Sequence, residues 1–301
     1  MLGRGVILVV ACGAAIVSRG QALEPRFYSN APVGLNFALG GYVLSSGDVA
    51  VDPAVQLDDA SIDIHAPFVA YARSLGLFGR SAKFDVAVPY TFLDGSARDA
   101  NGEMVTRTVD GFADPSFRFS YNFIGAPALT LAEFKDYRQN FVMGASMKVT
   151  APFGQYDSSK LVNIGTHRWS FTPELGMSKC IGRVLLEVSG AVTLYTDNDA
   201  FAGQTKEQAP MYSLQGHLVY VFRKKMWVAL GATRYSGGRS TVGGVEKGDM
   251  QQNTRLGATL GIPVSRRNSI KLYGSSGVET RTGSDFNTYG AAWQYRWGGG
   301  L

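Results

Sequence analysis

Apolar and polar side chains alternate at every second residue in many segments between residues 35 and 297. Segment 81–93 is the clearest case, with apolar or aromatic residues at the even positions Ala82–Phe92 and polar residues such as Lys83 and Asp85 between them. A period of two places successive side chains on opposite faces of a β-strand. The pattern therefore predicts strands whose two faces meet different environments.

About a dozen such segments follow one another, most of them about ten residues long, the length that a tilted strand needs to cross a bilayer. The mean hydropathy of −0.02 does not argue against this, because a barrel strand averages its lipid face with a polar face. The predicted strands are 35–45, 60–74, 81–93, 113–124, 140–151, 166–179, 184–196, 211–223, 226–236, 251–264, 268–280 and 284–297.

Short connections alternate with longer ones along the chain, which is the arrangement of outer-membrane barrels, with the short turns on the periplasmic side. The exception is 125–139, where Ala128–Arg138 is expected to form a brief amphipathic helix in a periplasmic turn. The predicted fold class is all-β, a transmembrane antiparallel β-barrel of about 12 strands with a short periplasmic helix. A water-soluble β-sandwich is the alternative, but it explains neither the loop asymmetry nor the aromatics on one face.

The amino terminus has the features of an export signal, and this signal together with the strand pattern predicts a location in the bacterial outer membrane. Arg4 precedes an apolar run over 6–17 that is too short to span a bilayer, and small residues end with Ala22, the expected cleavage point. Lipidation of Cys12 is a weaker alternative, because the apolar run continues beyond it. The expected organisation is a signal peptide at 1–22, a periplasmic N-terminal segment at 23–34, the barrel at 35–297 and a C-terminal tail at 298–301.

Charge and cysteine content exclude several other classes of protein. Removal of residues 1–22 removes Arg4, Arg19 and no acidic residue, so the net charge falls from +5 to +3, and no basic stripe with aromatics indicates nucleic-acid binding. Cys180 would be the one remaining cysteine, so no internal disulfide can form, and the three histidines are scattered. No cofactor, metal site or nucleic-acid partner is predicted.

Charged residues within the strands should point into the barrel, because a charge on the lipid face near the midplane costs roughly 2–4 kcal/mol. This lining would favour anionic or amphipathic solutes, or its charges would pair across neighbouring strands and fill a narrow lumen. The predicted inward set is Asp63, His65, Arg73, Lys83, Asp85, Arg118, Lys148, Arg168, Glu174, Glu187, His217, Arg255, Lys271, Glu279 and Arg296.

Aromatic residues near strand ends, such as Tyr90 and Trp169, should form the girdles at the two membrane interfaces. The last strand carries an outward aromatic stripe from Tyr289 to Trp297. We expect Trp297 to serve as the signal for barrel assembly, although four residues follow it. The expected partners are outer-membrane lipids and lipopolysaccharide, the barrel-assembly machinery and small-molecule solutes.

Six sequence runs, taken together, resemble outer-membrane transporter-like proteins of the putative meta-pathway phenol-degradation family. The resemblance covers most of the mature chain and implies an outer-membrane barrel that passes small, often aromatic, compounds. The runs are 28–37 (YSNAPVGLNF), 76–83 (GLFGRSAK), 114–118 (DPSFR), 151–157 (APFGQYD), 160–165 (KLVNIG) and 168–174 (RWSFTPE).

Two other functions remain open beside a channel or transporter for passive uptake. One is a structural or adhesive barrel with a closed lumen. The other is an outer-membrane hydrolase, for which Asp157, Ser158, Asn163 and His167 share one loop region, with Ser159 beside them. The sequence contains no G-x-S-x-G nucleophile elbow, and these polar residues are more simply explained as turn formers. No catalytic residue is therefore predicted.

Overall fold

The computed structural model describes residues 24–48, 58–98, 101–160, 162–280 and 285–301. The expected signal peptide and Cys12 lie outside these residues, as does part of the first long loop. Within the described part of the chain, no helix is both long and apolar enough to cross a membrane.

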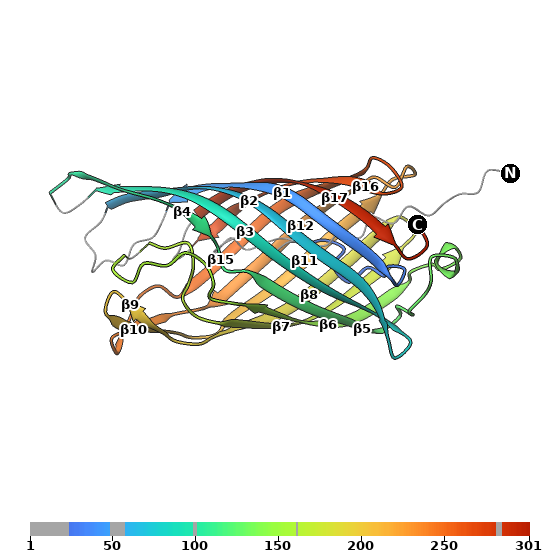
Figure 1. Ribbon diagram of the computed structural model, residues 1–301, viewed down its shortest axis with the longest axis horizontal. Helices are drawn as coiled ribbons and strands as arrows, with labels where there is room; N and C mark the ends of the chain where they lie inside the picture. The colour runs from blue at the N-terminus through green and yellow to red at the C-terminus, as the bar shows by residue number, and fades with distance from the viewer. Residues whose placement is uncertain (1–23, 49–57, 99–100, 161, 281–284) are drawn as a thin grey trace.

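Twelve antiparallel strands form one closed barrel (Figure 1). Each strand pairs with its neighbours along the chain, and pairing of the first strand with the last completes the ring. The strands are β1 (Leu35–Asp48), β2 (Asp58–Leu77), β3 (Arg80–Arg98), β5 (Ser116–Ile124), β6 (Phe141–Thr150), β7 (Ser170–Ile181), β8 (Val184–Tyr195), β11 (Met211–Val221), β12 (Trp227–Gly237), β15 (Gln251–Pro263), β16 (Asn268–Thr280) and β17 (Asp285–Gly298). The predicted number of strands is confirmed.

At the long-loop end, β3 and the strand that follows it form a hairpin that extends beyond the rest of the barrel (Figure 1). β4 (Met104–Phe112) pairs with the outer half of β3, and β5 pairs with its inner half. β4 and β5 are therefore one crossing strand interrupted at residues 113–115. With 20 residues, β2 is about twice as long as a membrane crossing requires, so its outer half projects above the bilayer.

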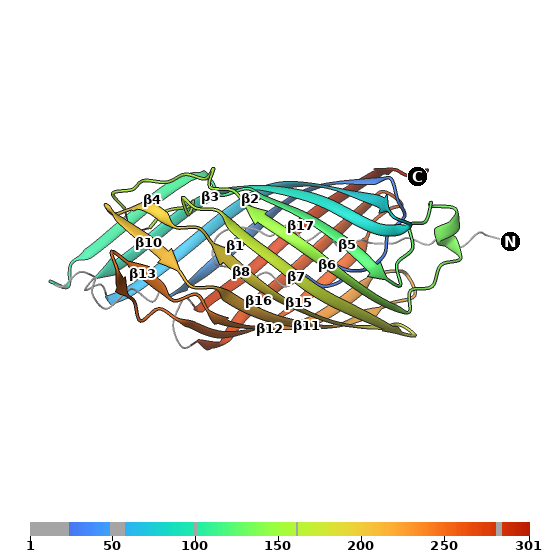
Figure 2. The same ribbon diagram turned by 90° about the horizontal axis from the view of Figure 1, so that it is seen from below.

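A small second sheet lies at the same long-loop end (Figure 2). It contains β9 (Asn198–Phe201), β10 (Gln204–Gln208), β13 (Ser240–Val242) and β14 (Val245–Glu246). The C-terminus and the short turns lie at the opposite end, which the short-turn rule identifies as the periplasmic end.

The predicted amphipathic helix over Ala128–Arg138 is wrong. This connection contains a single 3-10 turn, η2 (Glu133–Lys135). Its first residues are held extended by other segments: the Ala128 N–H donates to the Gly79 carbonyl, and the Leu129 carbonyl accepts from the Val33 N–H. These contacts bind the first two residues of the predicted helix to other segments, and the helical turn is confined to Glu133–Lys135.

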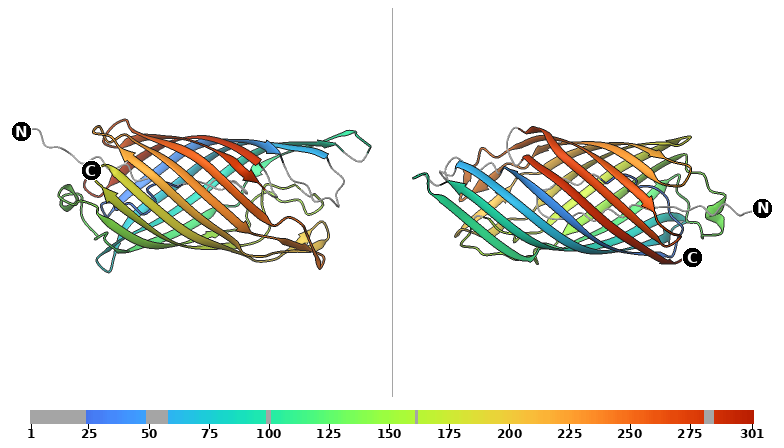
Figure 3. Two further views of the ribbon diagram at one scale, coloured as in Figure 1. Left: turned by 180° about the vertical axis from the view of Figure 1, so that it is seen from behind. Right: turned by 90° about the horizontal axis from the view of Figure 1, so that it is seen from above.

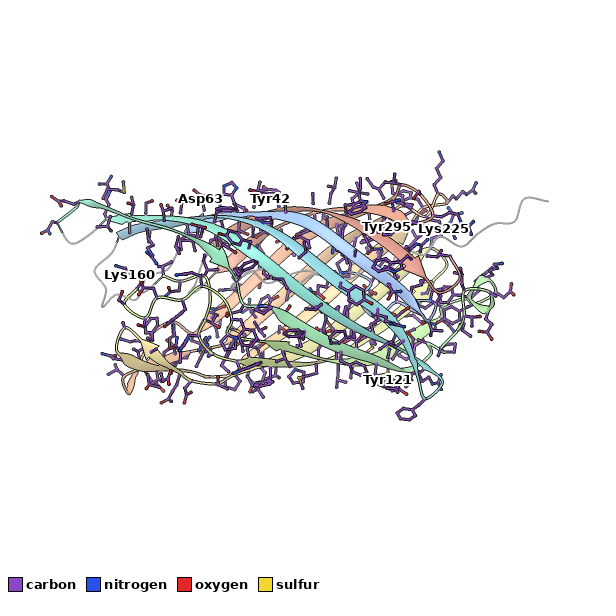
Figure 4. The ribbon with its side chains drawn as sticks, viewed as in Figure 1. Tyr42, Asp63, Tyr121, Lys160, Lys225 and Tyr295 are labelled. Atoms are coloured by element: carbon purple, nitrogen blue, oxygen red, sulfur yellow. The ribbon has the colours of Figure 1, made fainter. Side chains whose placement is uncertain are left out.

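The outer face of the barrel is the apolar belt that the alternation predicts. Leu186 and Val188 on β8 are 44% and 47% exposed, whereas Glu187 between them is 9% exposed. Aromatic side chains lie toward both ends of this belt. In Figure 4, Tyr42 lies toward the long-loop end, and Tyr121 and Tyr295 lie near the short-turn end. The belt matches a barrel that is surrounded by lipid.

Candidate functional site

The N-terminal segment does not extend into the periplasm as expected but lies inside the barrel (Figure 3). Residues 25–32 are all buried, and Asn30 and Ala31 have no exposed surface. This stretch forms no strand itself, and the side chains and backbone of the barrel wall cover it. We call residues 24–33 the N-terminal plug.

A tight turn folds the plug within the periplasmic half of the lumen. Arg26 has a left-handed backbone with φ of 67°, and the Ser29 N–H donates to the Arg26 carbonyl at 3.1 Å. The chain then joins the wall, where the Gly34 N–H donates to the Ser74 carbonyl at 3.0 Å just before β1 begins. The plug is thus a folded loop joined directly to the first strand.

Arg118 on β5 is the central contact between plug and wall. Its guanidinium forms ion pairs with Glu24 of the plug and with Asp85 on β3, the latter at 3.2 Å. Burial raises the pKa of the Glu24 carboxyl, but the charges of Arg118 and Lys148 lower it more, so the net shift is downward. Glu24 is therefore an ionised partner for a buried cation.

Two cations of the wall approach the Phe27 ring. The Arg118 guanidinium carbon is 3.9 Å from the ring centroid, and the Lys83 ammonium is 4.4 Å from it. The same ammonium donates a hydrogen bond to the Phe27 carbonyl. Cations over an aromatic face are attracted by the ring quadrupole, more strongly when both are desolvated.

On the other side of the lumen, the plug contacts β8 and β12. The Arg26 N–H donates to the Glu187 carboxylate at 2.6 Å, and His217 Nδ1 lies 3.9 Å from the same carboxylate oxygen. The Arg26 guanidinium carbon is 5.5 Å from the centroid of the Trp227 ring, which is fully buried. Trp227 lies against Gly261, its partner in the neighbouring strand.

Two paired glycines make a slot for the Tyr28 ring. Gly144 on β6 and Gly176 on β7 are direct partners in the ladder, and both are buried. A Cβ atom at Gly176 would lie 2.1 Å from the Tyr28 ring, and one at Gly144 would lie 2.6 Å from it. The Tyr28 hydroxyl donates to the Glu174 carboxylate at 2.8 Å. The wall is shaped to hold this side chain.

A different part of the inner wall is apolar. β1 and β2 turn Leu39, Val43, Ile64 and Phe68 inward, where they form one cluster with buried residues of β3, β17 and the plug. We call this cluster the inner apolar stripe. Its full set of buried members is Ala31, Leu35, Phe37, Leu39, Val43, Ile64, Ala66, Phe68, Ala72, Leu93 and Ala292.

The connection between β6 and β7 narrows the opposite opening. Val162 packs against the inner apolar stripe, and Ile164 is 2% exposed. Asp114 holds the loop in place by accepting hydrogen bonds from the Gly154 and Thr166 N–H groups. Lys160 of this loop is labelled at the long-loop end in Figure 4. The lumen is therefore narrowed at both ends.

The predicted lining residues fall into several groups. Lys83, Arg118, Glu174 and Glu187 contact the plug directly, and Asp85 pairs with Arg118. A second set faces inward beside these residues: Lys148 is the ladder partner of Arg118, His217 is the ladder partner of Glu187, and the Lys271 ammonium is 5.3 Å from the Tyr273 ring.

Three arginines of the predicted lining bind the wall or its rims. Arg255 is buried and donates to the Phe286 carbonyl at 2.7 Å, and Arg296 donates to the Arg266 carbonyl in a short turn. Arg168 lies at the long-loop opening, where it contacts Gln208. The hydrogen bonds of these three arginines stabilise the wall and its rims.

Glu279 does not face the lumen, contrary to the prediction. A bulge between β15 and β16 shifts the register, so that Arg255 pairs with Gly277 and Thr254 with Glu279. The extra residue moves Glu279 to the outer face, where its exposed carboxylate pairs with Arg234.

The inward placement of Asp63, His65 and Arg73 was also wrong. All three are exposed, whereas alternate residues on β2 such as Ile64 and Phe68 belong to the inner apolar stripe. Asp63 and His65 lie on the projecting outer half of β2, where the outside is aqueous, and the Tyr42 hydroxyl bonds to His65 at 2.9 Å. Arg73 lies four residues from the short-turn end of β2, near the other interface.

The loop residues considered for hydrolysis form hydrogen bonds within the loop. The Ser159 hydroxyl and N–H bind the Asp157 carboxylate and hold the pKa of that carboxyl below its usual range. Asn163 accepts from the Asp157 N–H, and Ser158 is exposed. His167 stacks on Tyr156 and lies 3.7 Å from Asp199. Among the described residues, no group of three or more potential ligands could hold a metal ion.

The plug residues Glu24, Arg26, Phe27 and Tyr28 were not predicted as site residues. Their segment shows no strand alternation, and their partners are at least 56 positions away in the sequence. The surplus of cations among the predicted lining residues was the one available signal, because buried charges need partners.

The family model described as "Putative MetA-pathway of phenol degradation" matches residues 35–295. The chain belongs to this family. Among solved structures, it is similar to an outer membrane channel from Pseudomonas putida F1, with a TM-score of 0.75 and 18% identity over 92% of this chain and 100% of that one. No curated protein matches the chain.

Two autotransporter barrels are also similar. The transport unit of AIDA-I from Escherichia coli has a TM-score of 0.51 and 7% identity, covering 87% of this chain and 90% of that one. The β domain of the Bordetella autotransporter BrkA has a TM-score of 0.51 and 11% identity, covering 88% and 100%. These similarities support the fold, an outer-membrane β-barrel.

The glycine slot predicts how the plug can be released. In a Cys180→Ser background, Ser29→Cys places a thiol at a position that is 2% exposed and should react slowly with a maleimide. Gly176→Ala introduces a Cβ that overlaps the Tyr28 ring. A steric cost of about 1–3 kcal/mol should raise the labelling rate roughly five- to hundredfold.

Gly190→Ala is the matched control, because a Cβ at Gly190 on the adjacent strand meets only the Ser213 carbonyl at 3.9 Å. This variant should label at the rate of the parent protein. Rapid labelling of the parent itself, unchanged by Gly176→Ala, would show that the plug is not held in the slot.

Proposed function

We propose that this protein is an outer-membrane channel for passive uptake of small solutes that have both an apolar face and a polar group. Small aromatic compounds belong to this class, and the description of the family refers to phenol degradation. The barrel supplies the aqueous path across the membrane, and its lining selects the solute. We assign no catalytic residue and no cofactor.

The observation that carries this proposal is the division of the inner wall into two sides. Ile64 and Phe68 of the inner apolar stripe lie on β2, whereas Lys83, Arg118 and Glu174 face inward from β3, β5 and β7. A solute moving between these two sides could keep its ring against the stripe and its polar group toward the charged side. A lining that is entirely apolar or entirely charged would not favour solutes that have both an apolar face and a polar group.

The plug is the main obstacle to conduction in this arrangement. It lies in the periplasmic half of the lumen and makes an ion pair and several hydrogen bonds with the wall. Solute passage therefore requires the plug to move. A plug that never moves would instead support the alternative function, a structural or adhesive barrel with a closed lumen.

Liposome swelling distinguishes the two functions. We expect proteoliposomes with the parent protein to swell in small polar solutes faster than protein-free liposomes, and those with Gly176→Ala to swell faster still. Gly190→Ala should match the parent protein. If correctly folded parent and Gly176→Ala proteins both give only the protein-free rate, the channel proposal fails and the closed-lumen function is supported.

We also propose that Trp297 carries the assembly signal, that the assembly machinery recognises it, and that lipopolysaccharide contacts the long-loop rim. Trp297 is 36% exposed near the end of β17 and stacks on Tyr295. We expect Trp297→Ala to lower the amount of folded barrel in cells several-fold while refolding into liposomes proceeds normally. Trp293→Ala, also on the outer face, is the control. Equal yields of the two variants would contradict this role.

A further inference from the structure

Arg118 contacts two chemically different groups of the plug at once. One of its terminal nitrogens binds the Glu24 carboxylate, and its guanidinium carbon is 3.9 Å from the centroid of the Phe27 ring. Lys83 approaches the same ring to 4.4 Å. A carboxylate and an aromatic ring, three positions apart in the plug, therefore converge on one buried cation of the wall.

Four charged side chains of β3, β5 and β6 lie around this point. Asp85, Arg118 and Lys148 are consecutive ladder partners on the inner faces of β3, β5 and β6, and Lys83 lies two residues from Asp85. These three strands contribute three cations and one carboxylate, and Glu174 on β7 and Glu187 on β8 add carboxylates to the inner wall beside them. Glu24 is the second carboxylate that Arg118 contacts, so departure of the plug removes one anionic partner of this buried guanidinium, and another carboxylate can take its place.

We propose that Lys83, Arg118 and Lys148 form a binding site for an aromatic carboxylate, and that Glu24 and Phe27 occupy this site in the present structure as an internal ligand. An aromatic acid presents in one molecule the two groups that the plug presents from two residues. Its carboxylate would receive charge-assisted hydrogen bonds, and its ring would lie against the cations.

The exchange between plug and solute involves no covalent step. The ligand carboxylate replaces the Glu24 carboxylate at Arg118, and the ligand ring replaces Phe27 beside Lys83. Binding of the plug and binding of the solute at this site exclude each other. The inference adds a binding site and a class of ligand to the proposed function. Binding at this site can be measured without any conduction.

The slot for Tyr28 allows the plug to be weakened while every cation of the site is kept. Gly176→Ala introduces a clash with the Tyr28 ring but touches none of the three cations. The fraction of protein with an unoccupied site should rise, and the apparent affinity for an added ligand should rise in proportion.

Calorimetric titration of the full mature protein in detergent with benzoate tests this inference. We expect the Kd for benzoate to be lower in Gly176→Ala than in the parent protein by about tenfold or more. Gly190→Ala should bind as the parent does. If Gly176→Ala does not fold, as judged by heat-dependent gel migration, the double variant Glu24→Gln with Phe27→Ala replaces it and should show the same gain.

Three further titrations identify the chemistry. Benzyl alcohol, which has a ring without a charge, and acetate, which has a charge without a ring, should each bind Gly176→Ala at least about tenfold more weakly than benzoate, a difference equivalent to about 1.4 kcal/mol. Adding Arg118→Gln to Gly176→Ala should weaken benzoate binding by a similar factor.

The inference is overturned if benzoate binds the parent and the plug-weakened variant equally, if Arg118→Gln leaves binding unchanged, or if benzoate binds none of these proteins. None of these results would change the interpretation of the swelling experiment. Failure of this site is therefore distinguishable from failure of the channel.

Discussion

The lumen of this barrel is organised around the buried guanidinium of Arg118. This cation has to be paired where it lies, because a buried charge without a partner is costly. Asp85 provides one partner from the neighbouring strand, and Glu24 provides the other from a segment 94 residues away in the sequence. Pairing of this wall residue with Glu24 thus helps to hold the plug inside the barrel.

Steric fit adds to this electrostatic requirement. Gly176 leaves space for Tyr28, and Gly261 leaves space for Trp227, over which Arg26 lies. Small residues at these points let large side chains fill the interior, as close packing requires. The charged contacts and the glycine slots hold the same segment in one position. The remaining wall, with the inner apolar stripe, keeps a different chemical character along β1 and β2.

The sequence allowed the barrel to be predicted well, because the cost of placing charges in lipid acts on every strand and leaves a period of two. The strand predicted at 184–196 is observed at Val184–Tyr195, for example. The prediction of inward-facing residues failed where a bulge changed the alternation of the two faces, or where a strand extended beyond the membrane. The bulge opposite Thr254 moved Glu279 outward, and the length of β2 placed Asp63 and His65 above the membrane.

The plug could not be predicted in the same way. Its residues have no repeating pattern, and their contacts depend on which strands the closed barrel brings to the same depth. Arg118, Glu174 and Glu187 were each expected to face inward, but no local signal connected them to Glu24, Tyr28 and Arg26. Long-range partners of this kind require the three-dimensional structure.

Photo-crosslinking from the plug tests the central claim most directly. p-Azidophenylalanine at position 28 has nearly the size of the native tyrosine and can be irradiated in intact outer membranes. The structure predicts intramolecular crosslinks to peptides of β6 and β7 around Gly144 and Gly176. Crosslinks to periplasmic proteins in place of these strands would show that the segment lies outside the barrel and would contradict the account.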